Sequence, residues 1–207
     1  MTKITERGMI FNGEMVRAIL DGRKTQTRRP IKWKQTRFTE IGEREDGSKW
    51  PWSEDAEHAC DFWHPCPFGA VGDRIWVREA FRVHSRATDV ATLVYKASER
   101  NSWTEQTRRV PVAVCNKPAT PEKWTPSLHM PRWASRILLE ITGVRVERLR
   151  SMSQDDARAE GVIAASGPME AGLAFRELWD SIYGEESWKA NPWVWVIEFK
   201  RVEGGAA

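Results

Sequence analysis

The stretch Ile19-Leu20-Asp21-Gly22-Arg23-Lys24-Thr25-Gln26-Thr27-Arg28-Arg29 carries the most chemical information in this 207-residue chain. Its glycine predicts a bend, and the residues that follow place an amine, two hydroxyls and several guanidinium groups together. A threonine hydroxyl is a poor nucleophile until a base removes its proton, and a lysine desolvated among other cations can act as that base. Because Lys24 and Thr27 are three residues apart, a helix or turn would let them face one site, whereas a straight strand would oppose them.

This stretch also begins a basic run. Residues 23–37 hold seven Lys and Arg residues and no acidic residue, and residues 40–61 hold eight acidic residues, so the formal net charge of the chain is only +3. A basic run is usually a solvated face, but a run without carboxylates suits an anionic partner such as a nucleotide phosphate. The arginines around Lys24 could supply a cationic surrounding for its amine or hold such a phosphate.

The composition excludes several classes of protein. The hydrophobic fraction is 41% and the mean hydropathy is −0.57, which are values of a globular chain and not of a disordered one. No apolar run approaches the roughly 18 residues of a membrane span, and the first residues lack the apolar core of a signal peptide. Three cysteines cannot all pair within one chain, so a reduced, cytoplasmic protein is expected. The 12 tryptophans are either large core residues or platforms for stacking bases.

Hydrophobic periodicity and capping signals predict an α+β domain with two or three helices. The expected helices cover 12–22, with Asn12 as N-cap, 153–161, with Ser153 as N-cap, and 169–182. The expected strands cover 74–83, 92–97, 109–114, 135–142, 144–149 and 193–202. Residues 30–72 are rich in proline and glycine and show little periodicity, which predicts an irregular insertion or a lid.

The stretch around Lys24 resembles the signature of ASCH domains, which are small PUA-like β-barrels linked to RNA. It is most similar to that of the bacterial N4-acetylcytidine amidohydrolases, and Thr27 stands where the broader ASCH motif usually has Glu. Three further segments agree in order: 72–77, 149–161 and 194–200. The chain also resembles long, Trp-rich ASCH-type proteins of phages and prophages. The resemblance implies a single ASCH/PUA-like domain over 1–207, a mixed β-barrel with insertions near 31–70 and 84–132.

The resemblance also implies an enzyme. Thr27 would be the nucleophile, Lys24 its activating base and Glu160 the third catalytic group, in an amidohydrolase that removes an acyl group from the exocyclic amine of N4-acetylcytidine or a related nucleoside. For each residue an ordinary role stays open. Lys24 could bind phosphate, Thr27 could be a buried strand hydroxyl, and Glu160 could pair with Arg158 or another arginine.

Five further residues are expected to bind the substrate: Arg23, Arg29, Trp76, Glu79 and Arg132. Glu79 falls on the inward face of the strand expected at 74–83, where a carboxylate needs a partner such as arginine, so it is either an ion-pair member or a site residue. Two alternatives to the hydrolase remain. The chain could be a non-catalytic RNA or DNA module that reads a modified base between aromatic side chains, or an ASCH-type ribonuclease.

No cofactor and no metal is expected. His58, Cys60, His64 and Cys66 have side chains that suit zinc, but their spacing matches none of the usual ligand pairs. The expected partner is a nucleoside, with RNA or DNA as further possibilities and no membrane. The sequence does not indicate an oligomeric state.

Overall fold

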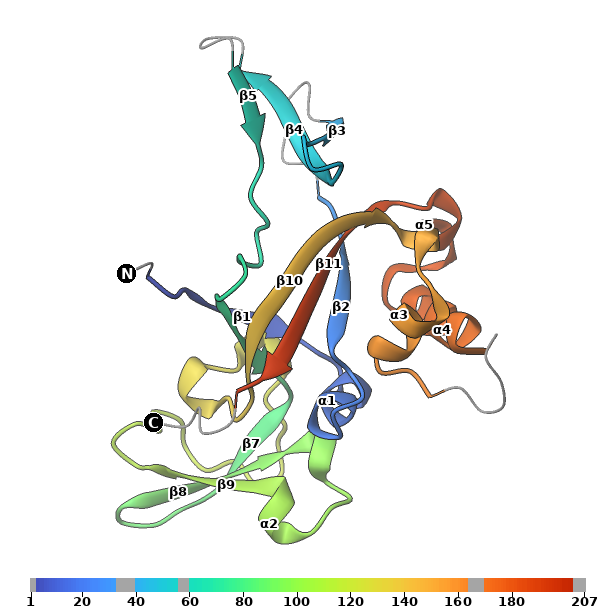
Figure 1. Ribbon diagram of the computed structural model, residues 1–207. Helices are drawn as coiled ribbons and strands as arrows, with labels where there is room; N and C mark the ends of the chain where they lie inside the picture. Colours follow the sequence, from blue (N-terminus) through green and yellow to red (C-terminus); the bar gives the residue numbers. More distant parts are fainter. Residues whose placement is uncertain (1–2, 33–39, 56–59, 164–169, 203–207) are drawn as a thin grey trace. The chain divides into compact units, whose positions relative to one another are not determined.

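A computed structural model describes residues 3–32, 40–55, 60–163 and 170–202. These residues form eleven strands and five α-helices, which confirms the α+β class (Figure 1). The helix count exceeds the two or three expected, because α2 (Trp103–Gln106) and α5 (Glu185–Ala190) are too short to leave a periodic pattern in the sequence. No sheet closes into a barrel within the described residues, so the PUA-like barrel stays a prediction.

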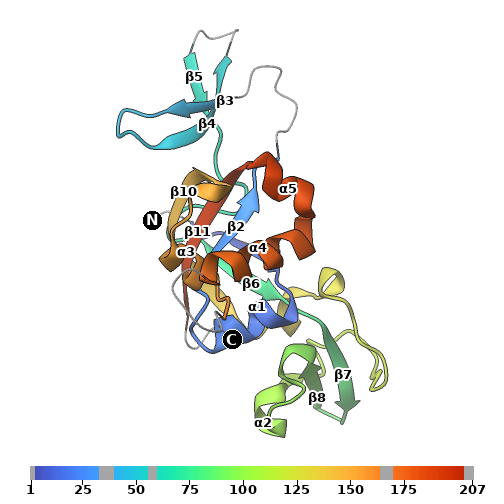
Figure 2. The same ribbon diagram turned by 90° about the vertical axis from the view of Figure 1, so that its right-hand side faces the viewer.

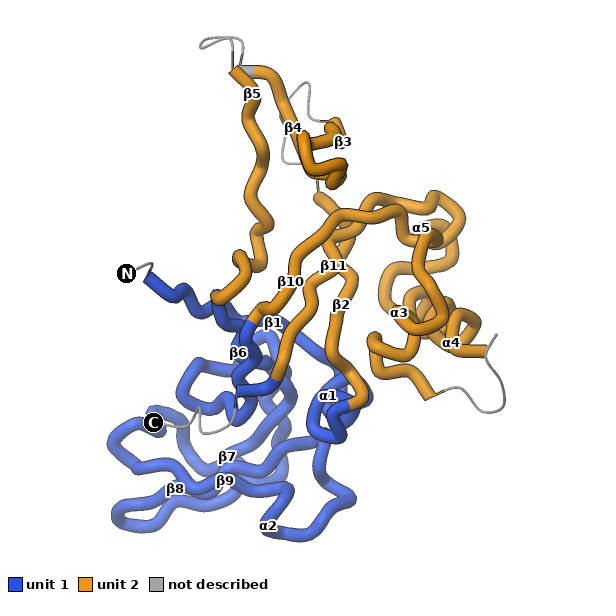
Figure 3. Tube along the Cα trace, viewed as in Figure 1, with its two compact units in different colours: residues 1–22, 73–140, 201–207 blue, residues 23–72, 141–200 orange. Residues whose placement is uncertain are grey.

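The chain divides into two compact units, coloured separately in Figure 3. Unit 1 comprises residues 1–22, 73–140 and 201–207, and unit 2 comprises residues 23–72 and 141–200. Each unit has a hydrophobic core of its own.

In unit 1, β1 (Glu6–Ile10) pairs in parallel with β6 (Arg74–Arg78), and the first residues of β10 (Leu138–Arg148) pair with β6 in the antiparallel direction. Gly8 allows the first pairing, because a Cβ atom there would lie 2.5 Å from Cζ2 of Trp76. The helix α1 (Gly13–Leu20) follows β1 and begins at the expected cap, where the Asn12 side chain accepts a hydrogen bond from Met15 N at 2.8 Å.

A second sheet of unit 1 consists of β7 (Phe81–Arg86), β8 (Val90–Tyr95) and β9 (Thr107–Pro111), all antiparallel. Alternating residues of these strands are buried and build the core of the unit with side chains from 115–134. Four 3-10 helices complete the described elements of the chain: η1 (Lys96–Ser98), η2 (Ser127–His129), η3 (Arg132–Ala134) and η4 (Leu149–Ser151).

In unit 2, β2 (Gln26–Pro30) pairs antiparallel with β11 (Trp193–Arg201), and β10 is the next strand beside β11. The helices α3 (Gln154–Ala159) and α4 (Glu170–Tyr183) lie side by side against one face of these strands (Figures 1 and 2). Their contact is apolar, since buried residues of both helices pack on Val194 and Val196 of β11. The expected helices and closing strand of this region are confirmed.

The expectation that residues 30–72 are irregular is wrong where three strands form, and for residues 33–39 and 56–59 it falls outside the described residues. The segment contains a three-stranded antiparallel sheet of β3 (Glu40–Glu43), β4 (Lys49–Asp55) and β5 (Cys60–Trp63). Pro51 suggested a loop but lies within β4, and the cross-strand pair of Trp52 and Trp63 supports the sheet. Gly42 leaves room for Trp63, whose ring would be 3.0 Å from an added Cβ atom.

One predicted strand also differs from the structure. The strand expected at 74–83 is interrupted between Arg78 and Phe81, where the inward-facing Glu79 pairs with Arg136 and its backbone N–H donates to Met130 Sδ at 3.2 Å. The segments on either side of Gly143, which the sequence allows to be either one bent strand or a tight pair, form one strand, β10. A Cβ atom at Gly143 would lie 2.7 Å from Oε2 of Glu198, so the glycine serves a close approach and not a turn.

Candidate functional site

The structure brings Lys24 and Glu160, which are far apart in sequence, into one buried ion pair in unit 2. Lys24 Nζ donates hydrogen bonds of 2.8 Å to Glu160 Oε2 and to the Glu160 backbone carbonyl. The Lys24 and Glu160 side chains are only 0% and 2% exposed, so water does not compete for these bonds. The sequence expectation that the two residues share one site is therefore matched by a direct contact.

The backbone explains why this pair forms. Lys24 and Glu160 make an isolated antiparallel bridge, and the N–H of Thr25 donates to the carbonyl of Ala159 at 2.8 Å. Glu160 is the C-cap of α3, and Gly161 follows it with φ +85°, a conformation that glycine adopts without strain. The helix end thus lies beside the segment that precedes β2.

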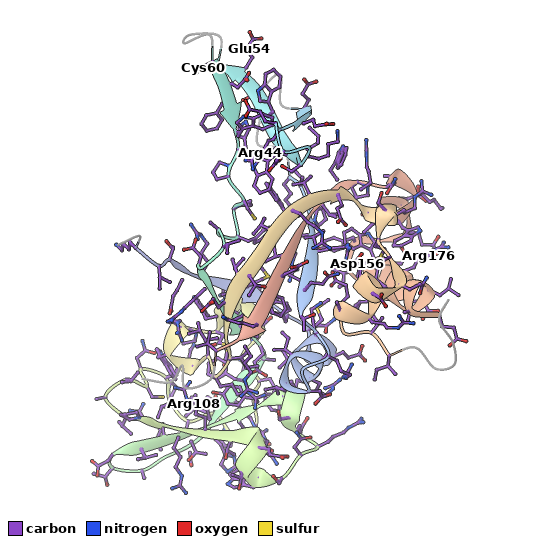
Figure 4. The ribbon with its side chains drawn as sticks, in the orientation of Figure 1. Arg44, Glu54, Cys60, Arg108, Asp156 and Arg176 are labelled. Atoms are coloured by element: carbon purple, nitrogen blue, oxygen red, sulfur yellow. The ribbon has the colours of Figure 1, made fainter. Side chains whose placement is uncertain are left out.

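Arg28 ties Glu160 to two further carboxylates. Its Nη1 donates to Glu160 Oε1 at 3.1 Å, and its Nη2 lies 3.2 Å from Glu147 Oε2 and 3.4 Å from Asp156 Oδ1. Gln26, two residues earlier on the same strand, also donates to Asp156. Strand residues two apart share a face, so Gln26 and Arg28 both point toward α3. Both side chains contact Asp156 of that helix, which is labelled in Figure 4.

A second arginine extends this charged cluster. Arg145 of β10 donates to Glu147 at 2.5 Å, to Asp156 at 2.8 Å and to Glu198. The cluster therefore joins three cations and four carboxylates from β2 and the segment before it, β10, β11, the first turn of α3 and the C-cap of that helix. The residues are Lys24, Arg28, Arg145, Glu147, Asp156, Glu160 and Glu198.

The environment favours a neutral Lys24 more than water would. Burial is the largest influence and lowers the pKa of Lys24; Glu160 opposes it, and the charges of Arg29 and Arg28 lower the pKa further. Asp156 behaves in the opposite way. Although burial alone would raise the pKa of Asp156, hydrogen bonds from Ser153 and the charge of Arg28 bring it down to about 2. The cluster thus holds a carboxylate that stays ionised and an amine that loses its proton more readily than usual.

Thr27 is buried in β2, where only 1% of it is exposed, and it is paired in register with Ile197 of β11. Strand alternation puts its side chain on the face of β2 opposite to those of Gln26 and Arg28. Of the conformations considered for this segment, the chain adopts the strand, in which the Lys24 and Thr27 side chains are expected to point in opposite directions. The structure therefore joins Lys24 to Glu160 directly, and shows no such contact for the Thr27 hydroxyl.

The other predicted site residues fall into two groups. Arg23 belongs to unit 2 and donates through Nη1 to the carbonyl of Gly161 at 2.7 Å, so it lies next to the ion pair. Arg29 is also in unit 2, half-buried in β2. The remaining three residues belong to unit 1 and have partners there: Trp76 packs over Gly8, Glu79 pairs with Arg136, and Arg132 donates to Glu6 at 2.9 Å.

The segment that holds the cysteine and histidine side chains suited to zinc is described in part. No group of three or more His, Cys, Asp or Glu side chains suited to a metal occurs in the described ranges of the chain, and His58 lies outside them. Cys60 is exposed at the start of β5 (Figure 4), Cys66 is buried, and His64 bonds to the hydroxyl of Ser53 at 2.9 Å. No helix among the described residues is both long and apolar enough to cross a membrane.

Sequence reasoning missed most of the carboxylates of the cluster. Glu147 and Glu198 come from two strands, and nothing in their local sequence sets them apart from solvated acids. Asp156 is marked by its local sequence only as the carboxylate three residues after the Ser153 cap, and not as a member of the cluster. The one signal in the sequence was the two-residue spacing of Gln26 and Arg28, which puts both side chains on the same face of a strand. No family model, curated protein or solved structure matches the chain.

Proposed function

We propose that the protein is an ASCH-type amidohydrolase that removes an acyl group from the exocyclic amine of N4-acetylcytidine or a related nucleoside. The observation that carries the proposal is the buried pair of Lys24 and Glu160, with both hydrogen bonds at 2.8 Å. These are two of the three residues to which the resemblance assigns catalysis. A PUA-like arrangement of the strands belongs to the same proposal.

The pair suits proton transfer during amide hydrolysis. A neutral Lys24 amine accepts the proton of the attacking hydroxyl, and its lowered pKa makes that neutral form accessible. The tetrahedral intermediate then expels the cytosine amine, which leaves with the proton that Lys24 took from the nucleophile, delivered by the Lys24 ammonium itself or by Glu160 after that proton has passed to its carboxylate. If Thr27 is the nucleophile, the acyl group remains on its oxygen as an ester until water hydrolyses that ester.

The test is hydrolysis of N4-acetylcytidine by the full chain, followed by chromatography of the cytidine formed. Glu160→Gln removes the negative charge but keeps the shape, and we expect turnover to fall by about 100-fold or more, as for loss of a general acid or base. Lys24→Ala should abolish turnover. Circular dichroism of each variant establishes that it is folded, because removing one member of a buried pair also destabilises a protein.

Thr27→Val separates the nucleophile from the base. Thr25→Val is its matched control, since Thr25 is exposed and makes backbone bonds only, to Ala159 and Phe199. Loss of activity in Thr27→Val alone supports the covalent route. Full activity in Thr27→Val would show that water attacks directly, and no hydrolysis by the wild-type protein would contradict the proposal as a whole.

A further inference from the structure

Unit 1 contains a cavity of about 690 Å³ that none of the proposed catalytic residues lines. Four segments surround it: the start of α1, the interruption between β6 and β7, the turn that begins with η1, and η2. Its volume lies within the range of about 300 to 1,000 Å³ that is usual for sites of small organic ligands.

The walls of this cavity are fixed to one another. The N–H of Phe11 donates to the carbonyl of Arg78 at 3.2 Å, and the N–H of Lys96 donates to the carbonyl of Ala80 at 3.0 Å. Arg17 of α1 donates through Nη1 to the carbonyl of Ala97 at 3.3 Å. Bonds between the segments mean that the cavity is formed before any ligand arrives.

A buried carboxylate lies in the inner wall. Glu79 is 2% exposed, and its two oxygens accept hydrogen bonds from Arg136 at 2.8 and 3.1 Å. Arg136 is itself held, since it also donates to the Ser98 hydroxyl at 2.8 Å and lies 4.1 Å from the centre of the Tyr95 ring. Each carboxylate oxygen can accept more than one hydrogen bond, so Glu79 retains capacity for a donor on a ligand.

The rest of the inner wall is apolar, and the rim is charged. Buried Phe11 and Ala97 lie beside Glu79. The rim carries three cations (Arg17, Lys96, Arg100) against two carboxylates (Glu14, Glu99). With Glu79 neutralised by Arg136, the lining has an excess of one positive charge, which favours a ligand that carries an anionic group.

We propose that this cavity binds a nucleoside 5′-monophosphate whose base carries an exocyclic amine. The amine donates to the Glu79 carboxylate in the inner wall, and the phosphate accepts from the cations of the rim. The apolar surface between them accommodates the base and the sugar. Lys24, Thr27 and Glu160 do not line this cavity, and Glu79 is the one residue of its lining that was also expected to bind the hydrolase substrate. The inference therefore does not depend on the proposed hydrolysis.

Isothermal titration calorimetry of the full chain tests the inference with four probes: CMP, UMP, cytidine and inorganic phosphate. We expect CMP to bind about tenfold or more tightly than each of the others, because only CMP offers both the amine and the phosphate. Equal affinity for CMP and inorganic phosphate would overturn the inference, as would equal affinity for CMP and cytidine.

Two sets of variants locate the binding. The double variant Lys96→Ala/Arg100→Ala should reduce the affinity for CMP to that for cytidine, whereas Arg109→Ala, an exposed cation of β9 outside the cavity, should change nothing. Glu79→Gln should remove the preference for CMP over UMP. If Glu79→Gln does not fold, the double variant Lys96→Ala/Arg100→Ala still tests whether CMP binds in this cavity. Unchanged CMP affinity in the double variant would refute the site.

Discussion

Asp156 shows how one side chain links a helix start to the charged cluster. Its carboxylate accepts hydrogen bonds from the N–H and the hydroxyl of Ser153, at 2.9 and 2.8 Å, and so completes the capping box of α3. The same carboxylate contacts Arg145 at 2.8 Å and Arg28 at 3.4 Å. These partners outweigh burial and keep its pKa at about 2, below the usual 3.8.

The lowered pKa predicts how the stability of an Asp156→Asn variant depends on pH. A carboxylate with a depressed pKa stabilises the native state above its unfolded pKa, and this contribution is lost as the pH falls through the native value. We therefore expect wild-type protein to be more stable than Asp156→Asn above about pH 4, and the difference to shrink between about pH 4 and pH 2. Denaturant titrations at a series of pH values measure this difference.

The matched control for that experiment is Asp155→Asn. Asp155 is the neighbouring residue of the same helix turn, its side chain is 91% exposed, and it pairs only with Arg158 among the described ion pairs. We expect a small effect that hardly depends on pH. A stability difference for Asp156→Asn that stayed constant down to pH 2 would contradict the assigned role.

For single residues, the limit of the sequence was the face of β2 on which each side chain lies. The resemblance, together with the chemistry of residues 19–29, singles out Lys24, and the structure places its amine in contact with Glu160. The orientation of Thr27 depends on where β2 begins, and a five-residue strand whose buried residues are Gln26, Thr27 and Arg28 does not signal that start. A short strand without hydrophobic alternation is invisible to periodicity, so the face that Thr27 occupies could not be predicted.

At the element scale, the end of α3 positions Glu160. Gly161 has φ +85°, its N–H donates to the carbonyl of Arg158 at 2.8 Å, and its own carbonyl accepts from Arg23. A side chain with a Cβ atom is strained at this φ value, and asparagine tolerates it better than alanine does. The sharp end of the helix, and with it the direction of Glu160, depends on this residue.

We therefore expect Gly161→Ala to destabilise the protein by about 1 to 2 kcal/mol and Gly161→Asn by less. Chemical denaturation measures both variants. If the direction of Glu160 matters for hydrolysis, Gly161→Ala also lowers the turnover of N4-acetylcytidine more than Gly161→Asn does. Equal stability of alanine, asparagine and glycine at this position would contradict the requirement for a left-handed residue.

The elements that the sequence predicted well are those with their own local signals. The caps at Asn12 and Ser153 gave the starts of α1 and α3, and periodicity gave α4. The interruption at Glu79 could not be predicted, because alternation continues through it and its contacts with Met130 and Arg136 come from residues distant in sequence. The sheet of β3, β4 and β5 could not be predicted from the sequence, because Pro51, a residue type that usually marks a loop, lies within β4.

At the scale of the whole molecule, the α+β class followed from the sequence and the division into units did not. The two cores share no residue: Leu93 lies in that of unit 1, and Phe175 in that of unit 2. Both cores are assembled from residues distant in sequence, so their membership depends on tertiary packing that no local pattern encodes. The closed barrel implied by the resemblance likewise remains a prediction.

Separate cores predict local consequences of a core substitution. Leu93 is completely buried, and Leu93→Ala should cost about 2 to 5 kcal/mol through lost apolar contact and the cavity left behind. Hydrogen exchange followed by mass spectrometry should then show faster exchange in β7, β8 and β9, with protection of α4 and β11 retained. Leu128→Ala is the control, since Leu128 is 59% exposed in the same unit and should leave exchange unchanged. An equal rise of exchange in both units would mean that the two cores unfold as one, and Leu93 would then support the whole chain and not unit 1 alone.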